Sequence, residues 1–151
     1  MDAKTLPVEK EEFSFSTNYA KDAPWSDGLR DFFEYRDLGV AAATNGRFKA
    51  QVIRAKDGGD VSGLHTTGLH RHELDFQLIY ILKGWIKFIY HVEGEDGSVH
   101  TEEHTFEAGD CCLQPPAILH NELECSDDVE LIEITSPAEY QTVALAEQET
   151  S

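Results

Sequence analysis

The stretch HRHELDFQLIYILKG, residues 70–84, decides how the rest of the chain is interpreted. His70 and His72 are one residue apart, and residues i and i+2 of a β-strand point to the same face. Two imidazoles side by side can chelate a divalent metal ion, although an H-x-H pair alone also occurs as a surface or hydrogen-bonded pair. Gln77 then opens an apolar run, where its amide needs partners for both oxygen and nitrogen. Coordination to a metal would satisfy the oxygen, and a backbone hydrogen bond is the alternative.

A second stretch, GDCCLQPPAILHNELE, covers residues 109–124. Pro115 and Pro116 cannot take part in a central strand ladder, so the chain must bend there. His120 follows the bend at the start of another predicted strand. It is therefore a candidate for a third imidazole, brought to the first two from across a barrel.

The remaining pattern predicts an all-β protein of one domain, because 151 residues are enough for one core and too few for two. Six to eight short strands with turns between them are typical of an antiparallel sandwich or barrel. Three local predictions go with this: a short helix over residues 26–38, a strand over 40–44 before the Asn45-Gly46 turn, and a helix start at 136–139. We expect an N-terminal arm over 1–36, a barrel over 37–136, and a short helix and tail over 137–151.

The two stretches resemble the two motifs of the cupin superfamily. His70, His72, Gln77 and Gly84 match the spacing of the first motif, in which glutamate is usual at the position of Gln77. Gly109, Pro115 and His120 match the second motif. The sequence departs from these motifs in three places. Leu64 stands where the first motif has its leading glycine, Ala117 replaces a glycine of the second, and Glu124 stands where the second has asparagine.

The resemblance implies a cupin jelly-roll β-barrel, an antiparallel double-stranded β-helix, with a metal ion in its mouth. Carried over residue by residue, the implied ligands are His70, His72 and His120, with Gln77 as the fourth. A neutral glutamine leaves the charge of a divalent site at +2, so the ion would stay a strong Lewis acid and trivalent states would be less well supported. This favours zinc, while iron, nickel, cobalt and manganese also bind imidazole.

A narrower likeness concerns the zinc-dependent cupin cyclases that act on aromatic polyketides. The pattern H-x-H-x4-Q, with DFQ before an apolar strand and the stretch LKGW, is similar to theirs. A further histidine joins the ligand shell in those enzymes. His65 is the candidate here, with a solvent-exposed loop histidine as the alternative.

Strand alternation also suggests which side chains line the site. Ile79 and Ile81 share a face with Gln77, and Ile86, Phe88 and Tyr90 share a face of the next strand; we interpret the isoleucines as core. Tyr90 is a candidate catalytic residue, because its hydroxyl could donate to a substrate oxygen. Glu124, and equally Glu122, have the parity of His120 and are candidate general bases, with solvent exposure as the alternative.

Composition limits the partners. The net charge of −17 would repel nucleic acid and an anionic membrane surface, so we expect neither. The polar, acidic beginning of the chain does not read as a signal peptide, so we expect a cytoplasmic protein in which Cys111, Cys112 and Cys125 pack without disulfides. The second face of the strands is apolar as well, with Leu78, Tyr80, Leu82 and Trp85. We expect a homodimer interface to cover it, with residues 26–38 of the same chain as the alternative.

The sequence therefore predicts a metal-dependent enzyme that acts on a small apolar or aromatic, oxygenated molecule. Cyclisation or isomerisation, by Lewis-acid and proton-transfer chemistry, is the first expectation. A non-haem metal dioxygenase is one alternative. The other is a non-catalytic cupin that binds a small molecule.

Overall fold

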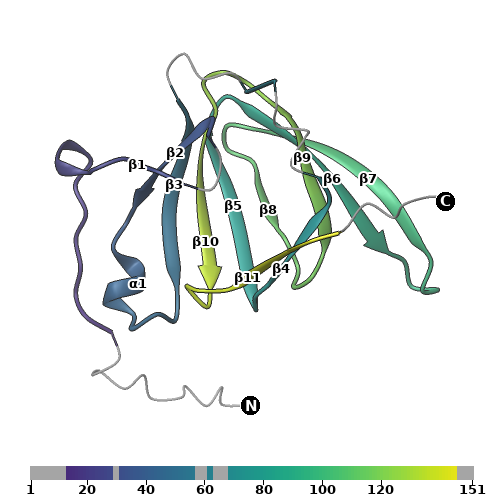
Figure 1. Ribbon diagram of the computed structural model, residues 1–151, viewed down its shortest axis with the longest axis horizontal. Helices are drawn as coiled ribbons and strands as arrows, with labels where there is room; N and C mark the ends of the chain where they lie inside the picture. The colour runs from purple at the N-terminus through teal and green to yellow at the C-terminus, as the bar shows by residue number, and fades with distance from the viewer. Residues whose placement is uncertain (1–12, 29–30, 57–60, 63–67, 146–151) are drawn as a thin grey trace.

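Two antiparallel sheets face each other in the computed structural model, which describes residues 13–28, 31–56, 61–62 and 68–145 (Figure 1). The first sheet has the strand order β1 (Ser26–Asp27), β2 (Phe33–Asp37), β3 (Lys49–Ala55), β10 (Glu130–Ser136), β5 (Phe76–Lys83) and β8 (Cys111–Leu113). The second has the order β11 (Gln141–Ala144), β4 (His70–Glu73), β9 (Leu119–Cys125), β6 (Trp85–Glu93) and β7 (Val99–Glu107). One 3₁₀ turn (Ala20–Asp22) and one α-helix, α1 (Val40–Ala43), complete the described elements. The predicted all-β jelly roll is confirmed.

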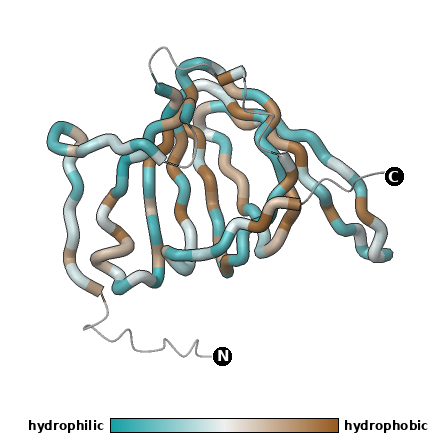
Figure 2. The backbone as a smooth tube through the Cα atoms, viewed as in Figure 1, coloured by the Kyte–Doolittle hydropathy of each residue, from teal (hydrophilic) through white to brown (hydrophobic). Residues whose placement is uncertain are grey.

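The core lies between the sheets and follows from the alternation of side chains along the strands (Figure 2). Ile79 and Ile81 of β5 and Ile86 of β6 are almost fully buried, as the sequence predicts. Each such side chain contributes about 1.5–3 kcal/mol to folding by leaving water. Phe88 and Tyr90 belong to the same cluster, so the face of β6 that was expected to line a substrate site is largely core.

Gly84 forms the corner at which the chain passes from the first sheet, at the end of β5, to the second sheet, at the start of β6. Its φ of +68° is a left-handed conformation that favours glycine. A Cβ atom here would approach the Cα of Val129 to 3.0 Å. The last glycine of the first motif therefore has a structural role.

The helix predicted over residues 26–38 is wrong. Residues 26–27 and 33–37 form β1 and β2, and β2 pairs with β3. Phe33 is buried by this pairing. Tertiary burial of Phe33 therefore outweighs the local helical pattern, which Gly28 already weakened.

The strand predicted over residues 40–44 is also wrong, because Val40–Ala43 form α1. Gly39 precedes it in a left-handed conformation, with its N–H donating to the Asp37 carboxylate at 3.1 Å. Three consecutive alanines then favour the helix. Asn45 and Gly46 both have positive φ, as predicted for a turn, but the turn connects a helix to β3 and is not a hairpin.

The helix predicted to begin at Ser136 is the third correction. The hydroxyl of Ser136 donates to the carbonyl of Arg47 at 2.7 Å and does not cap a helix, and the N–H of Ala138 donates to the carbonyl of Gly46. Residues 141–144 form β11, which pairs with β4. The chain thus returns beside the strand that carries the first two histidines.

Strands on both sides of residues 37–136 join the sheets, so the division into arm, barrel and tail stays a prediction. The three cysteines are free. No helix among the described residues is long and apolar enough to cross a membrane.

Candidate metal centre

Three histidines from two adjacent strands meet in the second sheet. His70 of β4 and His120 of β9 are register partners, and His72 lies two residues along β4. The potential ligand atoms of the three imidazoles all lie within 4.8 Å of one another. His70 and His120 are buried, with 3% and 1% of their surface exposed, while His72 is half-buried.

A hydrogen-bond partner at the Nδ1 atom orients each imidazole. The Nδ1 of His70 lies 2.9 Å from the carbonyl oxygen of Gly68, and the Nδ1 of His120 lies 3.0 Å from that of Ile118. A carbonyl can only accept, so both Nδ1 atoms carry a proton, and in the neutral imidazole the lone pair is then on Nε2. The Nδ1 of His72 lies 2.8 Å from the hydroxyl of Thr142 on β11, which is consistent with the same tautomer.

This arrangement fits a divalent metal ion. Protein metal sites orient ligating histidines by a hydrogen bond from the ring nitrogen that does not bind the ion. Ligand atoms at about 2.0–2.2 Å from one ion lie about 3–3.5 Å apart, so the most widely spaced imidazoles would need to close by up to about 1.5 Å. His70, His72 and His120 would hold the ion.

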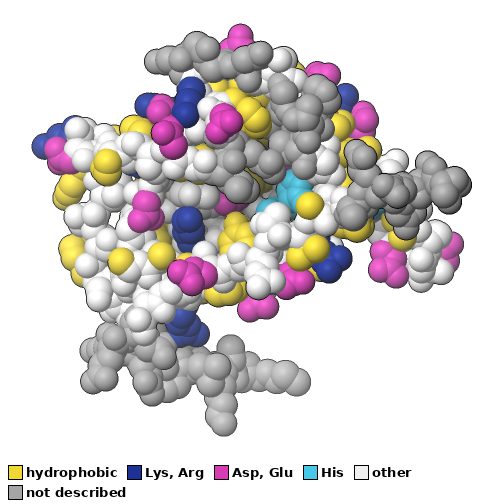
Figure 3. Space-filling view, viewed as in Figure 1, with side chains coloured by type: hydrophobic (Ala, Val, Ile, Leu, Met, Phe, Trp, Pro, Cys, Tyr) yellow, Lys and Arg dark blue, Asp and Glu magenta, His cyan; other side chains and the backbone are white. Residues whose placement is uncertain are grey.

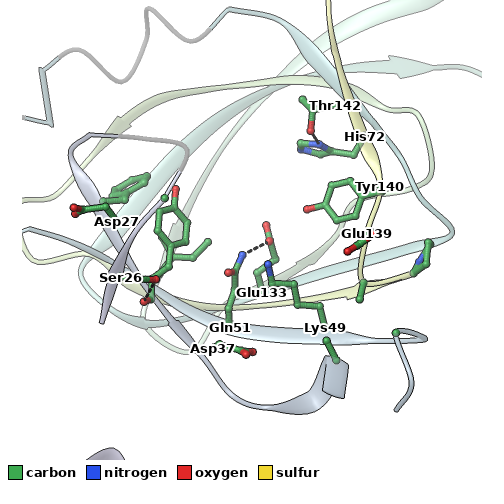
Figure 4. Close-up of a pocket in the computed structure, with 18 of the residues that line it drawn as sticks. Ser26, Asp27, Asp37, Lys49, Gln51, His72, Glu133, Glu139, Tyr140 and Thr142 are labelled. Atoms are coloured by element: carbon green, nitrogen blue, oxygen red, sulfur yellow. Dashed lines mark hydrogen bonds between the residues drawn. The ribbon is translucent and has the colours of Figure 1, made fainter. Parts of the chain in front are cut away.

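The cluster lies at the wall of a cavity of about 730 Å³, called here the histidine pocket. His70 and His72 line it, and histidine atoms are visible in a recess of the surface in Figure 3. Figure 4 shows His72 and Thr142 on one side of this cavity, Tyr140 and Glu139 beside them, and Glu133 and Gln51 on the facing sheet. The wall is therefore contributed by both sheets.

Glu133 of β10 is a residue that the sequence interpretation missed. Its two carboxylate oxygens accept hydrogen bonds from the amides of Gln51 and Gln77, both at 3.0 Å. Burial raises the pKa of this carboxyl, and the two amide hydrogen bonds partly oppose that change. The sequence did hold a sign that Glu133 points inward, because it has the same parity as the buried Leu131 and Thr135 along the strand VELIEIT.

Gln77 is buried on β5, with 3% of its surface exposed. Its amide nitrogen donates to Glu133 on the neighbouring strand β10. The described residues that line the histidine pocket do not include Gln77. Its role as a metal ligand stays a prediction.

Tyr90 is buried and is not among the described residues that line the histidine pocket. Its ring centroid lies 6.0 Å from that of His120, and its hydroxyl accepts a hydrogen bond from Gln114 at 2.9 Å. Burial raises its pKa above the ordinary value. It borders a separate cavity of about 230 Å³ with Phe106 and Ile118, so its catalytic role stays a prediction.

The structure separates the two candidate bases, Glu122 and Glu124. The register between β9 and β6 shifts, so that Glu122 pairs with Phe88 while Glu124 pairs with Lys87. Glu122 lines the histidine pocket, with an oxygen 4.0 Å from the Nε2 of His70. Glu124 is exposed and borders a different hollow, so the structure does not bring it to the histidines. The predicted catalytic role of Glu124 required it to face the histidines, as strand parity suggested, and it does not.

Two further residues were named from the sequence, and the structure describes one of them. Ala117, where the second motif has glycine, adopts a left-handed conformation with φ of +63°, so the backbone shape of the motif is kept without glycine. His65, the candidate for a further ligand, lies outside the described residues.

Comparisons with known proteins support the fold. No family model matches the chain, and no curated protein matches it by sequence. Solved structures match with TM-scores above 0.5. They include an oxalate decarboxylase of Bacillus subtilis with Mn(II) centres (TM-score 0.55, 17% identity, covering 80% of this chain and 30% of that one) and KdgF of Halomonas sp. (0.57, 19%, 81% and 94%). An RmlC-like cupin of Shewanella frigidimarina NCIMB 400 also matches (0.51, 19%, 84% and 95%).

These likenesses show that the chain has the cupin fold. The chain spans about a third of the length of the oxalate decarboxylases that it matches. At these identities the comparison concerns the fold alone. What the chain does must be argued from its own site.

Proposed function

We propose that this chain is a metal-dependent enzyme that binds one divalent ion at His70, His72 and His120. Its substrate is a small oxygenated molecule with an apolar or aromatic body. One observation carries the proposal: three imidazoles, each oriented through Nδ1, converge beside a cavity of about 730 Å³ that His70 and His72 line. Metal-dependent neighbours with the same fold support it, as does the match of the histidines to both motifs.

The walls of the histidine pocket fit such a substrate. Phe33, Tyr35, Ile53 and Tyr140 give it an apolar and aromatic part. Gln51 and Glu133 give it a polar part on the facing sheet. Pockets for small molecules typically combine these two components, the apolar part for affinity and the polar part for orientation.

The reaction class that suits this site is cyclisation or isomerisation through an enolate. The ion, when bound, supplies Lewis acidity that polarises a carbonyl oxygen. Glu133 faces the cavity with its carboxyl group held by two amides, which gives it a fixed orientation for exchanging a proton with the substrate. Zinc is the favoured metal because the three histidines are neutral ligands and the reaction needs no redox change.

Metal analysis and turnover tests examine this proposal. We expect the full chain, purified without added metal, to contain about one zinc ion per chain. We expect turnover of at least one compound in a panel of phenols and diketones, and His70→Ala should abolish it. A bound redox metal with substrate-dependent oxygen uptake would favour the dioxygenase alternative. Tight binding of a panel compound without turnover would favour the non-catalytic alternative.

A further inference from the structure

Glu122 repeats on β9 the relationship that joins the two histidines of β4. His120 and Glu122 are i and i+2 on β9 and pair with Tyr90 and Phe88 of β6, which share one face. His70 and His72 are i and i+2 on the adjacent strand β4. Two neighbouring strands thus each present two side chains with metal-binding groups to the same side of the sheet.

The position of the Glu122 carboxylate fits this pattern. One of its oxygens lies 4.0 Å from the Nε2 of His70, which is comparable to the spacing among the three imidazoles. Its side chain is 19% exposed and lines the histidine pocket together with His70 and His72. Carboxylate oxygens are ordinary ligands of divalent ions alongside imidazole nitrogens.

Gln77 fits a fourth-ligand role less well, although it stands where the first motif usually has glutamate. Its amide nitrogen donates to Glu133 on the adjacent strand. The described residues that line the histidine pocket include Glu122 and exclude Gln77. Gln77 thus orients a neighbouring carboxylate within its own sheet.

We propose that Glu122 supplies the fourth ligand of this metal centre, in place of Gln77. The inference rests on the metal site of the proposed function. It changes the charge at the centre, because three neutral imidazoles and one carboxylate leave a divalent ion with a net charge of +1. The chain would then have moved the carboxylate of the common cupin site from β5 to β9.

Metal titration of the full chain tests this inference without any substrate. The protein is stripped with a chelator and titrated with Zn²⁺ against a chromophoric competitor, and separately with Co²⁺, whose visible spectrum reports its ligands. We expect Glu122→Gln to weaken Zn²⁺ binding at least about tenfold, since loss of an outer hydrogen-bond partner alone costs 10–100-fold. We also expect the Co²⁺ spectrum to change. Glu122→Asp, which keeps the charge but shortens the side chain, should weaken binding too and serves if the first variant fails to fold.

Three control variants give the result its meaning. Glu124→Gln removes a carboxylate from the same strand but not from the histidine pocket, and Glu133→Gln removes one from the pocket wall. Both should keep the Zn²⁺ affinity and the Co²⁺ spectrum of the parent chain. Gln77→Asn should also keep the Zn²⁺ affinity and the Co²⁺ spectrum. It shortens the side chain so that its amide cannot reach a ligand position, which matters only if Gln77 is a ligand.

The possible failures can be distinguished. A parent chain that binds neither ion would refute the proposed function itself. Strong binding by the parent chain that Glu122→Gln leaves unchanged would overturn only the inference, and a loss in Gln77→Asn would return the fourth position to Gln77. An equal loss in Glu133→Gln would show that Glu122 acts through its charge alone, which also overturns the inference.

Discussion

His70 and His120 are register partners on β4 and β9, and their ring centroids lie 4.4 Å apart. Fifty positions of sequence separate them, and each belongs to a different motif-like stretch. The strand pairing brings the two stretches together at one point. The metal centre is therefore a consequence of the sheet register.

His72 offers the cleanest test of this centre, because it is half-buried and its replacement leaves a smaller cavity than replacement of His70 or His120. We expect His72→Ala to lose most of its bound metal, since one of three imidazole ligands is gone. Metal content measured by mass spectrometry on the purified chain checks this. His100→Ala is the matched control, because His100 is exposed on β7. Equal metal content in the two variants would contradict the proposed site.

Thr142 should influence metal affinity through His72. Its hydroxyl lies 2.8 Å from the Nδ1 of His72, and such a partner typically accounts for 10–100-fold in metal affinity. We expect Thr142→Val to weaken Zn²⁺ binding by roughly that factor, while Thr142→Ser, which keeps the hydroxyl, should stay close to the parent chain. Competition titration with a chelator measures both. Equal affinities for Val and Ser would show that the hydroxyl does not orient the imidazole.

The histidine cluster could be predicted from sequence because it depends on local spacing within two strands. His70 and His72 need only strand alternation, and His120 needs one motif distance. Thr142 could not be found in this way. It reaches His72 because the chain returns as β11 beside β4, where a helix was predicted from a local capping pattern.

The two glutamates of β9 show a second limit of sequence reasoning. Parity predicts that Glu122 and Glu124 face the same side, but the register shift against β6 sends only Glu122 to the histidine pocket. A bulge of this kind depends on how two strands pack and leaves no mark in the pattern of either strand. Glu133 is the opposite case, because strand parity does place it inward with Leu131 and Thr135, and the sequence interpretation did not use that signal.

Cys125 should be the slowest of the three cysteines to react with thiol reagents. Burial raises the pKa of its thiol to about 12, so at pH 8 very little of it is the reactive thiolate, and the fraction rises about tenfold for each pH unit up to that value. Cys111, by contrast, is exposed. Alkylation at pH 8 followed by peptide mass spectrometry should modify Cys111 first and Cys125 only after unfolding. Comparable rates in the folded chain would contradict the burial of Cys125.

The homodimer expected from the sequence stays a prediction, and the outer face of the first sheet is where we expect it. Tyr80, Leu82 and Leu113 are exposed there on β5 and β8, and an apolar patch of this kind on a sheet face marks an interaction surface. Leu113→Lys should convert a dimer to a monomer, as measured by light scattering after size exclusion. Val99→Lys, on the exposed strand β7, should not. A monomeric parent chain would refute the prediction.

Ala117 should limit the stability of the chain, because its φ of +63° is a left-handed conformation that costs alanine about 1–2 kcal/mol relative to glycine. Ala117→Gly would remove that cost. It would also raise the conformational entropy of the unfolded chain, which lowers the free energy of unfolding by about 0.4–1 kcal/mol. We therefore expect a net gain of about 0.5–1 kcal/mol in the free energy of unfolding of the metal-free protein. For a chain of this size this corresponds to a melting temperature about 1–4 °C higher, measurable by calorimetry.

Ala108→Gly is the matched control for this substitution. Ala108 lies in the turn after β7, and Asn45 and Ala117 are the non-glycine residues with positive φ in the described part of the chain. Glycine at position 108 relieves no left-handed conformation, so only the unfolded-state effect remains and the chain should lose about 0.4–1 kcal/mol. A gain of stability in Ala117→Gly and a loss in Ala108→Gly would establish that position 117 requires a left-handed backbone, although alanine stands there in place of the second motif's glycine. A loss of stability in Ala117→Gly equal to that in Ala108→Gly would show that the turn imposes no such requirement.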